Sequence, residues 1–356
     1  MERSAKIYVA GHNGLVGSAI WTNLQKKGYT NLIGRSHKEL DLMDRVSVKR
    51  FFDEESLEYV FLAAAHVGGI VANNTYRADF IYNNLQIQQN IIGESFSHGI
   101  KKLLFLGSTC IYPRDARQPM SEDELLTSSL EYTNEPYAIA KIAGLKMCES
   151  FNLQYGTNYI AVMPTNLYGP NDNFDLERSH VLPAMIRKIH LADRLQKDDM
   201  KSIRKDFYRR PVEGIKGDSN EDDILNILSK YGIAKDSVKL WGTGKPLREF
   251  LWSEEMADAC VFIMERVDFN DLKRTDDVRN CHINIGTGKE ISIKDLSTLI
   301  ANIVGYTGNI IFDANKPDGT MRKLTDPSKL HSLGWHHRIE IEDGVKMAYD
   351  WYKSLR

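Results

Sequence analysis

Five nearly all-apolar runs recur in the first half of the chain, separated by segments with helical spacing. The runs are residues 6–10, 31–35, 59–65, 102–108 and 159–165. Strands that helices cover on both faces have uninterrupted apolar sequences of this kind. Between the runs, residues 15–28 and 83–99 carry apolar side chains at helical spacing. This alternation predicts an α/β fold built on a Rossmann-like, doubly wound parallel sheet.

The alternation of apolar runs and helical segments becomes less regular after residue 165. We expect a dinucleotide-binding domain over residues 1–165, with return segments from later in the chain. A smaller C-terminal α/β substrate-binding region is expected over residues 166–356. Its first helix is predicted at 179–192, with Ser179 as a possible cap.

A densely charged stretch spans about residues 192–238. Its second part predicts a helix that begins at Ser219 or Asn220 and ends before Gly232. Charge runs usually mark solvated faces, so we expect a solvated surface insertion. The alternative is a segment that binds a partner.

Composition narrows the possible partners and the compartment. The formal net charge of the 356 residues is −2, which offers no global field for nucleic acid or an anionic membrane. The N-terminus enters a strand at once, and no apolar stretch approaches the roughly 20 residues that span a bilayer. The four cysteines show no CxxC spacing, so we expect no disulfide framework, no metal site and a cytoplasmic protein.

Three glycines, Gly11, Gly14 and Gly17, follow the first predicted strand and open the first predicted helix. The first glycine suits a tight turn, and the second allows backbone N–H groups to approach a pyrophosphate. The third allows close packing of helix and strand. This context predicts dinucleotide binding.

The end of the second strand indicates which dinucleotide binds. An acidic residue there would hold a free ribose 2′-hydroxyl, whereas a cation suits a 2′-phosphate. The chain has Arg35, Ser36 and His37 at this position and no acid before Glu39. NADP, in its reduced form NADPH, is therefore the predicted cofactor. The alternative is that Arg35 is only a surface charge.

A Tyr-x-x-x-Lys motif places both side chains on one helix face, where the lysine can lower the tyrosine pKa. The chain contains the motif at Tyr137/Lys141, Tyr231/Lys235 and Tyr349/Lys353. The second spans a predicted helix stop, and the third lies near the C-terminus, far from the sheet. Only Tyr137/Lys141 opens a long helix between two parallel strands. Ser108, which ends the preceding strand, completes a hydride-transfer site.

Longer motifs carry a resemblance to a known family. They are "AGHNGLVGSAI", "AAAHVGGI", "GSTCIYP", "YAIAK", "PTNLYGPNDNF", "SHVLPA", "WGTGKPLREFL" and "KPDGTMRKL". The glycine spacing resembles the extended short-chain dehydrogenase/reductase superfamily. Almost the whole chain except 192–238 resembles its GDP-L-fucose synthase branch, the GDP-4-keto-6-deoxy-D-mannose 3,5-epimerase-4-reductases.

The resemblance implies NADPH-dependent 3,5-epimerisation and 4-reduction of GDP-4-keto-6-deoxy-D-mannose to GDP-L-fucose by a homodimer, formed through helices that flank the sheet. It assigns epimerisation to Cys110 and His180, beside Ser108, Tyr137 and Lys141. Cofactor contacts are implied for Gly11, His12, Asn13, Gly14, Leu15, Val16, Gly17, Arg35, Ser36, His37, Asp41, Leu42, Ala63, Ala65, Leu106, Gly107, Tyr137, Lys141, Pro164, Thr165, Asn166, Leu167 and His180. Substrate contacts are implied for Ser108, Asn166, Lys188, Trp241, Arg248 and Asp318.

Each assignment has an alternative. Cys110 could be an inert small hydrophobe, His180 a surface residue, and Arg248 the partner of Glu249 or Glu254 in a structural ion pair. The chain departs from the family pattern at Asn13 and His66, where family members often carry Arg and Lys. Two other functions stay open: a C4-reductase of another GDP-4-keto sugar, such as a 6-deoxy-heptose, and a non-catalytic NADP-binding regulatory protein.

Overall fold

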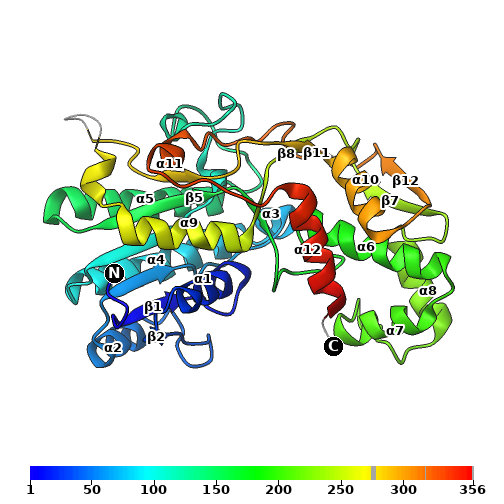
Figure 1. Ribbon diagram of the computed structural model, residues 1–356, viewed down its shortest axis with the longest axis horizontal. Coiled ribbons are helices and arrows are strands. Elements are labelled where there is room, and N and C mark those ends of the chain that lie inside the picture. The colour runs from blue at the N-terminus through cyan, green and yellow to red at the C-terminus, as the bar shows by residue number, and fades with distance from the viewer. Residues whose placement is uncertain (274–277, 317, 355–356) are drawn as a thin grey trace. The chain divides into compact units, whose positions relative to one another are not determined.

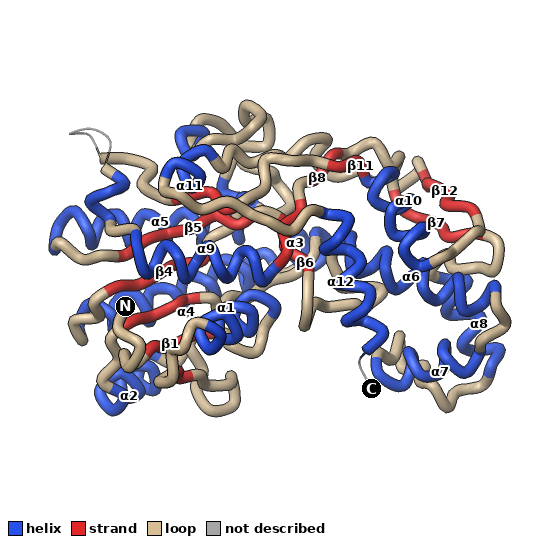
Figure 2. The backbone as a smooth tube through the Cα atoms, in the orientation of Figure 1, coloured by secondary structure: helices blue, strands red, loops and turns tan. Residues whose placement is uncertain are grey.

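A parallel sheet of six strands forms the centre of the larger part of the molecule. The computed structural model describes residues 1–273, 278–316 and 318–354. The strand order is β10–β5–β4–β3–β1–β2 (Figure 2). The strands are β1 (Ile7–Ala10), β2 (Leu32–Ile33), β3 (Tyr59–Leu62), β4 (Lys102–Leu106), β5 (Tyr159–Pro164) and β10 (Ile283–Ile285). This sheet confirms the predicted fold class and all five predicted strands.

Helices cover both faces of the sheet because side chains on successive strand residues point in opposite directions. Ile7 and Val9 join one apolar core, whereas Tyr8 and Ala10 join the other. One face packs on α1 (Leu15–Lys26) and α9 (Ser253–Arg266), which lie side by side in Figure 1. The other face packs on α2 (Arg45–Glu55), α4 (Arg77–Ser97) and α5 (Glu135–Tyr155).

The chain divides into two compact units. Unit 1 comprises residues 1–171, 249–289 and 324–339, and unit 2 comprises residues 172–248, 290–323 and 340–356. Unit 1 also holds α3 (Ile70–Thr75), η1 (Thr109–Ile111), η2 (Glu122–Glu124), β6 (Asn166–Tyr168), β9 (Phe250–Trp252), η3 (Phe269–Leu272) and α11 (Ser328–Ser332). Unit 2 holds α6 (Val181–Gln196), α7 (Met200–Arg209), α8 (Glu221–Lys230), β7 (Ser237–Trp241), β8 (Leu247–Arg248), β11 (Ile291–Ser292), α10 (Ile293–Val304), β12 (Asn309–Asp313) and α12 (Ile341–Ser354).

Three small sheets accompany the central one. β6 pairs with β9 in unit 1, and β12 pairs with β7 in unit 2, both in parallel. β11 pairs with β8 in unit 2, antiparallel. None of the helices in the described ranges is long and apolar enough to cross a membrane.

The charged stretch at 192–238 includes two helices, α7 and α8, each with a buried apolar face. The apolar residues Ile203 and Phe207 of α7 and Ile224 and Leu228 of α8 are fully buried. Both helices are amphipathic: most of their charged residues lie on the outward faces, with Asp206 of α7 as a buried exception, and the apolar residues anchor the segment.

The caps in this region were only partly predicted. His180, not Ser179, is the N-cap of α6, because the Ser179 hydroxyl donates to the Asp175 carbonyl instead. Asn220 is the N-cap of α8, and Gly232 follows the helix end with a φ of 71°.

Candidate active site

The glycine loop after β1 has the shape that a pyrophosphate requires. A Cβ on Gly17 would lie 2.1 Å from the Gly11 carbonyl oxygen, and one on Gly11 would lie 2.8 Å from the Ala64 nitrogen. Both positions therefore need glycine for the fold itself. At Gly14 the nearest atom would be 3.6 Å away, so nothing within the described chain requires glycine there.

Gly14 is also the N-cap of α1, and no side chain caps the helix there. The first N–H groups of α1 therefore face outward beside a residue with no Cβ. A helix N-terminus of this kind attracts an anion, so the loop fits the diphosphate of a dinucleotide.

The side chain of Arg35, shortly after β2, has two hydrogen-bond partners. Its Nη2 donates to Glu55 at 2.5 Å, and its Nη1 donates to the Gly34 carbonyl at 3.0 Å. The imidazole of His12 packs against Gly34, and its Nδ1 is buried without a hydrogen-bond partner in the described residues. His37 is largely exposed, with its Nδ1 3.8 Å from the Asp41 carboxylate. Glu55 and the Gly34 carbonyl thus hold the Arg35 guanidinium beside the end of β2.

Most other predicted cofactor residues follow strands of the parallel sheet. Ala63 and Ala65 follow β3, Leu106 and Gly107 end β4, and residues 164–167 run from the end of β5 into β6. The carboxyl ends of parallel strands meet at one edge of the sheet, where such folds bind ligands. The sheet thus brings these residues to the same edge as the glycine loop.

Ser108, Cys110, Tyr137 and Lys141 come together beside the end of β4. Ser108 caps the short helix η1, and its hydroxyl accepts a hydrogen bond of 3.3 Å from the Cys110 backbone N–H. Lys141 donates to the Leu106 carbonyl at 2.7 Å, with its Nζ 5.7 Å from the centre of the Tyr137 ring. Tyr137 and Lys141 both project from α5, four residues apart.

Burial dominates the protonation of this group. Desolvation, and then the neighbouring Cys110, raise the pKa of Tyr137. Desolvation lowers the pKa of Lys141 to about 8, although Cys110 opposes that shift. The pKa of Tyr137 is therefore raised and not lowered as expected, because the loss of hydration is the largest influence on the phenol. Cys110 interacts electrostatically with both residues, so its thiol lies within the group.

The two other Tyr-x-x-x-Lys motifs belong to unit 2. α8 ends at Lys230, before the Tyr231/Lys235 pair, and the Tyr231 hydroxyl donates to Glu213. Tyr349 and Lys353 lie on α12, in unit 2.

Five of the predicted site residues lie in unit 2. His180 is exposed at the start of α6, and desolvation nevertheless lowers its pKa, so the imidazole is neutral near pH 7. Lys188 is buried on the same helix; its Nζ lies 3.3 Å from the Lys239 carbonyl, and desolvation lowers its pKa to about 8. Trp241 ends β7 with 63% of its surface exposed, and Lys316 lies 5.4 Å from its ring centre.

Arg248 forms neither of the ion pairs considered above. Glu249 is fully buried and accepts hydrogen bonds from the backbone N–H groups of Thr287 (2.5 Å), Gly288 (2.8 Å) and Thr325 (2.9 Å). Glu254 pairs with Lys26. Within the described ranges, no acidic side chain lies within ion-pair distance of the Arg248 guanidinium.

Asp318 is already engaged within unit 2. Its carboxylate accepts from the Thr243 backbone N–H at 2.9 Å and from the Thr243 hydroxyl at 2.7 Å. This contact fixes the turn after Trp241, where Gly242 has a φ of 80°. Sequence reasoning missed Thr243 and Lys316, because each acts through a residue about 75 positions away along the chain.

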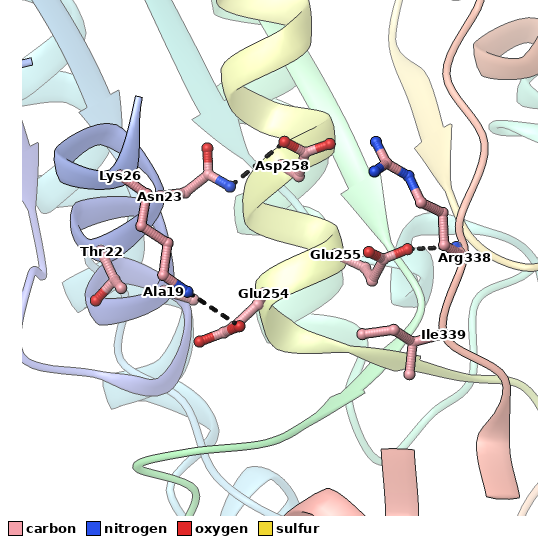
Figure 3. A pocket seen from close by; sticks show the side chains of 9 residues that line it. All are labelled: Ala19, Thr22, Asn23, Lys26, Glu254, Glu255, Asp258, Arg338 and Ile339. Carbon is pink, nitrogen blue, oxygen red and sulfur yellow. Dashed lines mark hydrogen bonds and ion pairs between the residues drawn. The ribbon is translucent and has the colours of Figure 1, made fainter. Parts of the chain in front are cut away.

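A groove on the outer surface of α1 and α9 is separate from these residues (Figure 3). It encloses about 180 Å³ and is lined by Ala19, Thr22, Asn23, Lys26, Glu254, Glu255, Asp258, Arg338 and Ile339. Its carboxylates already have partners: Glu254 bonds Lys26, Asp258 bonds Asn23, and Glu255 accepts from the Arg338 backbone N–H. The carboxylates of the groove are therefore engaged, whereas Oδ1 of Asn23 is buried without a partner among the described residues. The described residues also contain no cluster of acidic, His or Cys side chains that could hold a metal.

The comparisons with known proteins agree with this geometry. The profile of the NAD dependent epimerase/dehydratase family matches residues 7–206 and 214–286. The chain belongs to this family. It is 50% identical to GDP-L-fucose synthase 1 of Arabidopsis thaliana over 99% of this chain and 94% of that protein. It is 47% identical to the GDP-L-fucose synthase of Escherichia coli (strain K12), over 98% of this chain and 96% of that protein. The resemblance inferred from the motifs is confirmed.

Similar solved structures indicate which cofactor binds. A GDP-6-OMe-4-keto-L-xylo-heptose reductase from C. jejuni superposes with a TM-score of 0.94 and 46% identity, covering 100% of this chain and 99% of that one. A GDP-mannoheptose C4 reductase from Campylobacter jejuni with NADP bound has a TM-score of 0.88 and 46% identity, covering 99% of this chain and 100% of that one. The chain is thus an NADP-dependent oxidoreductase and epimerase of this family, as predicted.

Proposed function

We propose that the chain converts GDP-4-keto-6-deoxy-D-mannose to GDP-L-fucose by epimerisation at C3 and C5 and NADPH-dependent reduction at C4. The observation that carries this proposal is that the Cys110 thiol lies close to Tyr137 and Lys141. Ser108, Tyr137 and Lys141 suffice for hydride transfer, whereas a thiol beside them adds a group suited to moving a carbon-bound proton. A thiol titrates close enough to neutrality for that role.

Epimerisation begins with the acidity of the substrate. C3 and C5 both adjoin the C4 carbonyl, so removing either proton places negative charge on O4. The hydroxyls of Ser108 and Tyr137 stabilise that charge by hydrogen bonding, as an oxyanion hole does. Inversion then requires one group to remove the proton from one face and a second group to deliver a proton to the other. Cys110 and His180 supply the two groups.

Reduction uses the same hydroxyls. NADPH, when bound at the glycine loop, supplies the hydride for C4. Tyr137 delivers its phenolic proton to O4 as that oxygen becomes an alkoxide. The raised pKa of Tyr137 keeps the phenol protonated at neutral pH, which is the state needed for a donor. Lys141 holds its place through the Leu106 carbonyl and can bind the nicotinamide ribose.

The GDP portion is expected to bind through unit 2. The guanidinium of Arg248 has no ion-pair partner in the described chain, and its planar fork suits bidentate contact with a diphosphate. The exposed ring of Trp241 offers a face on which the guanine can stack. Lys188 adds a cation, and Asp318 holds the turn that follows Trp241.

A second candidate is a C4-reductase of a GDP-4-keto-heptose. The solved heptose reductases are 46% identical over nearly the whole chain, close to the 47% and 50% of the fucose synthases. Such an enzyme would reduce a heptose substrate and exchange the protons at C3 and C5 of the fucose precursor poorly.

Isotope exchange tests the epimerase. The chain is incubated with GDP-4-keto-6-deoxy-D-mannose in D₂O without NADPH, and deuterium at C3 and C5 is followed by NMR. We expect label at both carbons for the wild-type chain and at least a 100-fold slower exchange for Cys110→Ser, of the size that removal of an acid-base group causes. Cys281→Ser is the control. Failure of the wild-type chain to label both carbons would falsify the bifunctional reading.

We also propose a homodimer formed through α4 and α5. Phe96, Leu153 and Tyr155 are 37%, 50% and 52% exposed at one end of these helices, with the rings of Phe96 and Tyr155 4.5 Å apart. Gly93 lies one turn before Phe96, and a Cβ there would meet nothing within 4 Å. Glycine costs about 1 kcal/mol relative to alanine inside a helix, and close approach of a second chain would account for it.

Light scattering tests the dimer. We expect a mass near twice that of the 40.6 kDa chain for the wild type and a monomer for Phe96→Glu/Tyr155→Glu. Tyr208→Glu, an exposed tyrosine of α7, is the control and should stay dimeric. A double variant that stays dimeric would exclude this surface. We place the protein in the reducing cytoplasm, in keeping with four buried cysteines of which none forms a disulfide.

A further inference from the structure

Tyr112, two residues after Cys110, connects the η1 turn to a buried polar cluster. The ring is almost fully buried. Its hydroxyl donates to Oδ1 of Asn284 at 2.5 Å and lies 3.0 Å from Nε2 of His282. Asn284 lies in β10 and His282 directly precedes that strand, about 170 residues away along the chain. A tyrosine that served only as apolar filling would not need these contacts.

The partners of Tyr112 are themselves fixed. Asn284 is fully buried in β10; its backbone N–H donates to Glu122 at 2.9 Å, and its Nδ2 donates to the Met120 carbonyl at 2.9 Å. The carbonyl of His282 accepts from Lys329 at 2.8 Å. Four segments therefore meet around one phenol. Most polar groups of this buried network are paired, although Nδ1 of His282 has no hydrogen-bond partner among the described residues. The paired groups hold one geometry, since slippage would leave them unpaired.

The segment from Ser108 to Tyr112 is braced internally and anchored at its C-terminal end. Within the segment, the Ser108 hydroxyl accepts from the Cys110 backbone N–H. At the C-terminal end, the Tyr112 hydroxyl is anchored to β10. Cys110 lies two residues before that anchor, in electrostatic contact with Tyr137 and Lys141. The cluster itself contains no group that belongs to the hydride-transfer site.

We propose that Tyr112 is a positioning residue that fixes the Cys110 thiol for proton transfer at the sugar carbons. The inference rests on the proposed epimerase function. Removing the Tyr112 hydroxyl frees one end of the turn, and misplacement of a reacting group by about 1 Å can cost 100-fold in rate. The glycine loop is a separate part of unit 1, so NADPH binding should not change.

The test compares Tyr112→Phe with the wild type in the D₂O exchange assay. We expect exchange at C3 and C5 to fall about 10- to 100-fold, with unchanged NADPH affinity. In the full reaction kcat should fall while KM for the GDP-sugar stays constant. Tyr159→Phe is the matched control: Tyr159 is equally buried, but its hydroxyl has no hydrogen-bond partner among the described residues. It should exchange at the wild-type rate.

The outcomes separate the two proposals. No exchange in the wild type overturns the proposed epimerase, whereas normal exchange in both the wild type and Tyr112→Phe overturns the positioning role alone. Equal losses of exchange, NADPH affinity and thermal stability would show a purely structural role and also overturn it. If Tyr112→Phe does not fold, His282→Phe serves in its place. Among the described residues, Nε2 of His282 contacts the Tyr112 hydroxyl and Nδ1 has no hydrogen-bond partner. In this variant exchange should fall by a smaller factor, and wild-type exchange would count against the proposal.

Discussion

At the scale of single residues, the glycine loop shows that the lack of a side chain can serve either the ligand or the fold. Gly14 is the clearest example, because its own chain leaves room for a side chain there. Gly17 has no such room. The two glycines look equivalent in the sequence, and only the structure separates a requirement of the ligand from a requirement of the fold.

This difference yields a prediction. Gly14→Ala should weaken NADPH binding about 10-fold, equivalent to about 1.4 kcal/mol, while its melting temperature stays at the wild-type value. Gly17→Ala, whose Cβ would lie 2.1 Å from a carbonyl oxygen, should lose thermal stability. Fluorescence titration and thermal unfolding measure the two effects. A Gly14→Ala chain with wild-type affinity would mean that the diphosphate lies elsewhere.

The buried Lys141 makes stability depend on pH. Its pKa is lowered to about 8 in the folded, cofactor-free chain, below its unfolded value of about 10.4. Between these values the unfolded chain binds more protons, so the free energy of unfolding should rise with pH, by at most about 1.4 kcal/mol per unit from this group. Denaturant titrations from pH 8 to about 9.5 should show a smaller rise for Lys141→Met. Equal slopes in the two chains would contradict the lowered pKa.

At the scale of elements, unit 2 contains a buried ion pair that sequence patterns do not reveal. The 192–238 stretch is densely charged, and one of its charges joins α7 to α6 in the interior of unit 2. Asp206 accepts from Arg187 at 2.9 Å and from the Tyr352 hydroxyl. Arg187 is fully buried. Its contacts with Asp206 and with two backbone carbonyls offset the cost of removing its charge from water. The sequence alone does not reveal which charges are paired inside.

Breaking that pair should loosen the segment. Asp206→Ala leaves the Arg187 charge buried without its partner, at a cost of about 3–5 kcal/mol. We expect faster hydrogen exchange across α7 and α8, measured by mass spectrometry, with unit 1 unaffected. Arg187→Met/Asp206→Leu should recover part of the protection, because the buried Arg187 charge is removed, whereas Arg210 and the Tyr352 hydroxyl still lose Asp206. Unchanged exchange in Asp206→Ala would show that the pair contributes little.

At the scale of the whole molecule, local patterns predicted the sheet and the position of Tyr137 and Lys141 on a helix beside it, whereas they did not predict long-range contacts. The glycine loop and Tyr137/Lys141 are short motifs next to predicted strands, so their places followed from topology. β10 was missed because its three residues carry no pattern of their own, and Tyr112 because its partners are 170 residues distant. The buried Glu249, which joins residues 287–288 and 325, was read only as a possible partner of Arg248. Such contacts follow from the fold and not from sequence spacing.

The most direct measurement is the identity of the product formed from GDP-4-keto-6-deoxy-D-mannose and NADPH in D₂O. The proposed function predicts GDP-L-fucose, with deuterium at C3 and C5 and one NADPH oxidised per sugar. A product reduced at C4 but unchanged at C3 and C5, a GDP-6-deoxy-D-hexose without label, would contradict it and leave Cys110 without its proposed role.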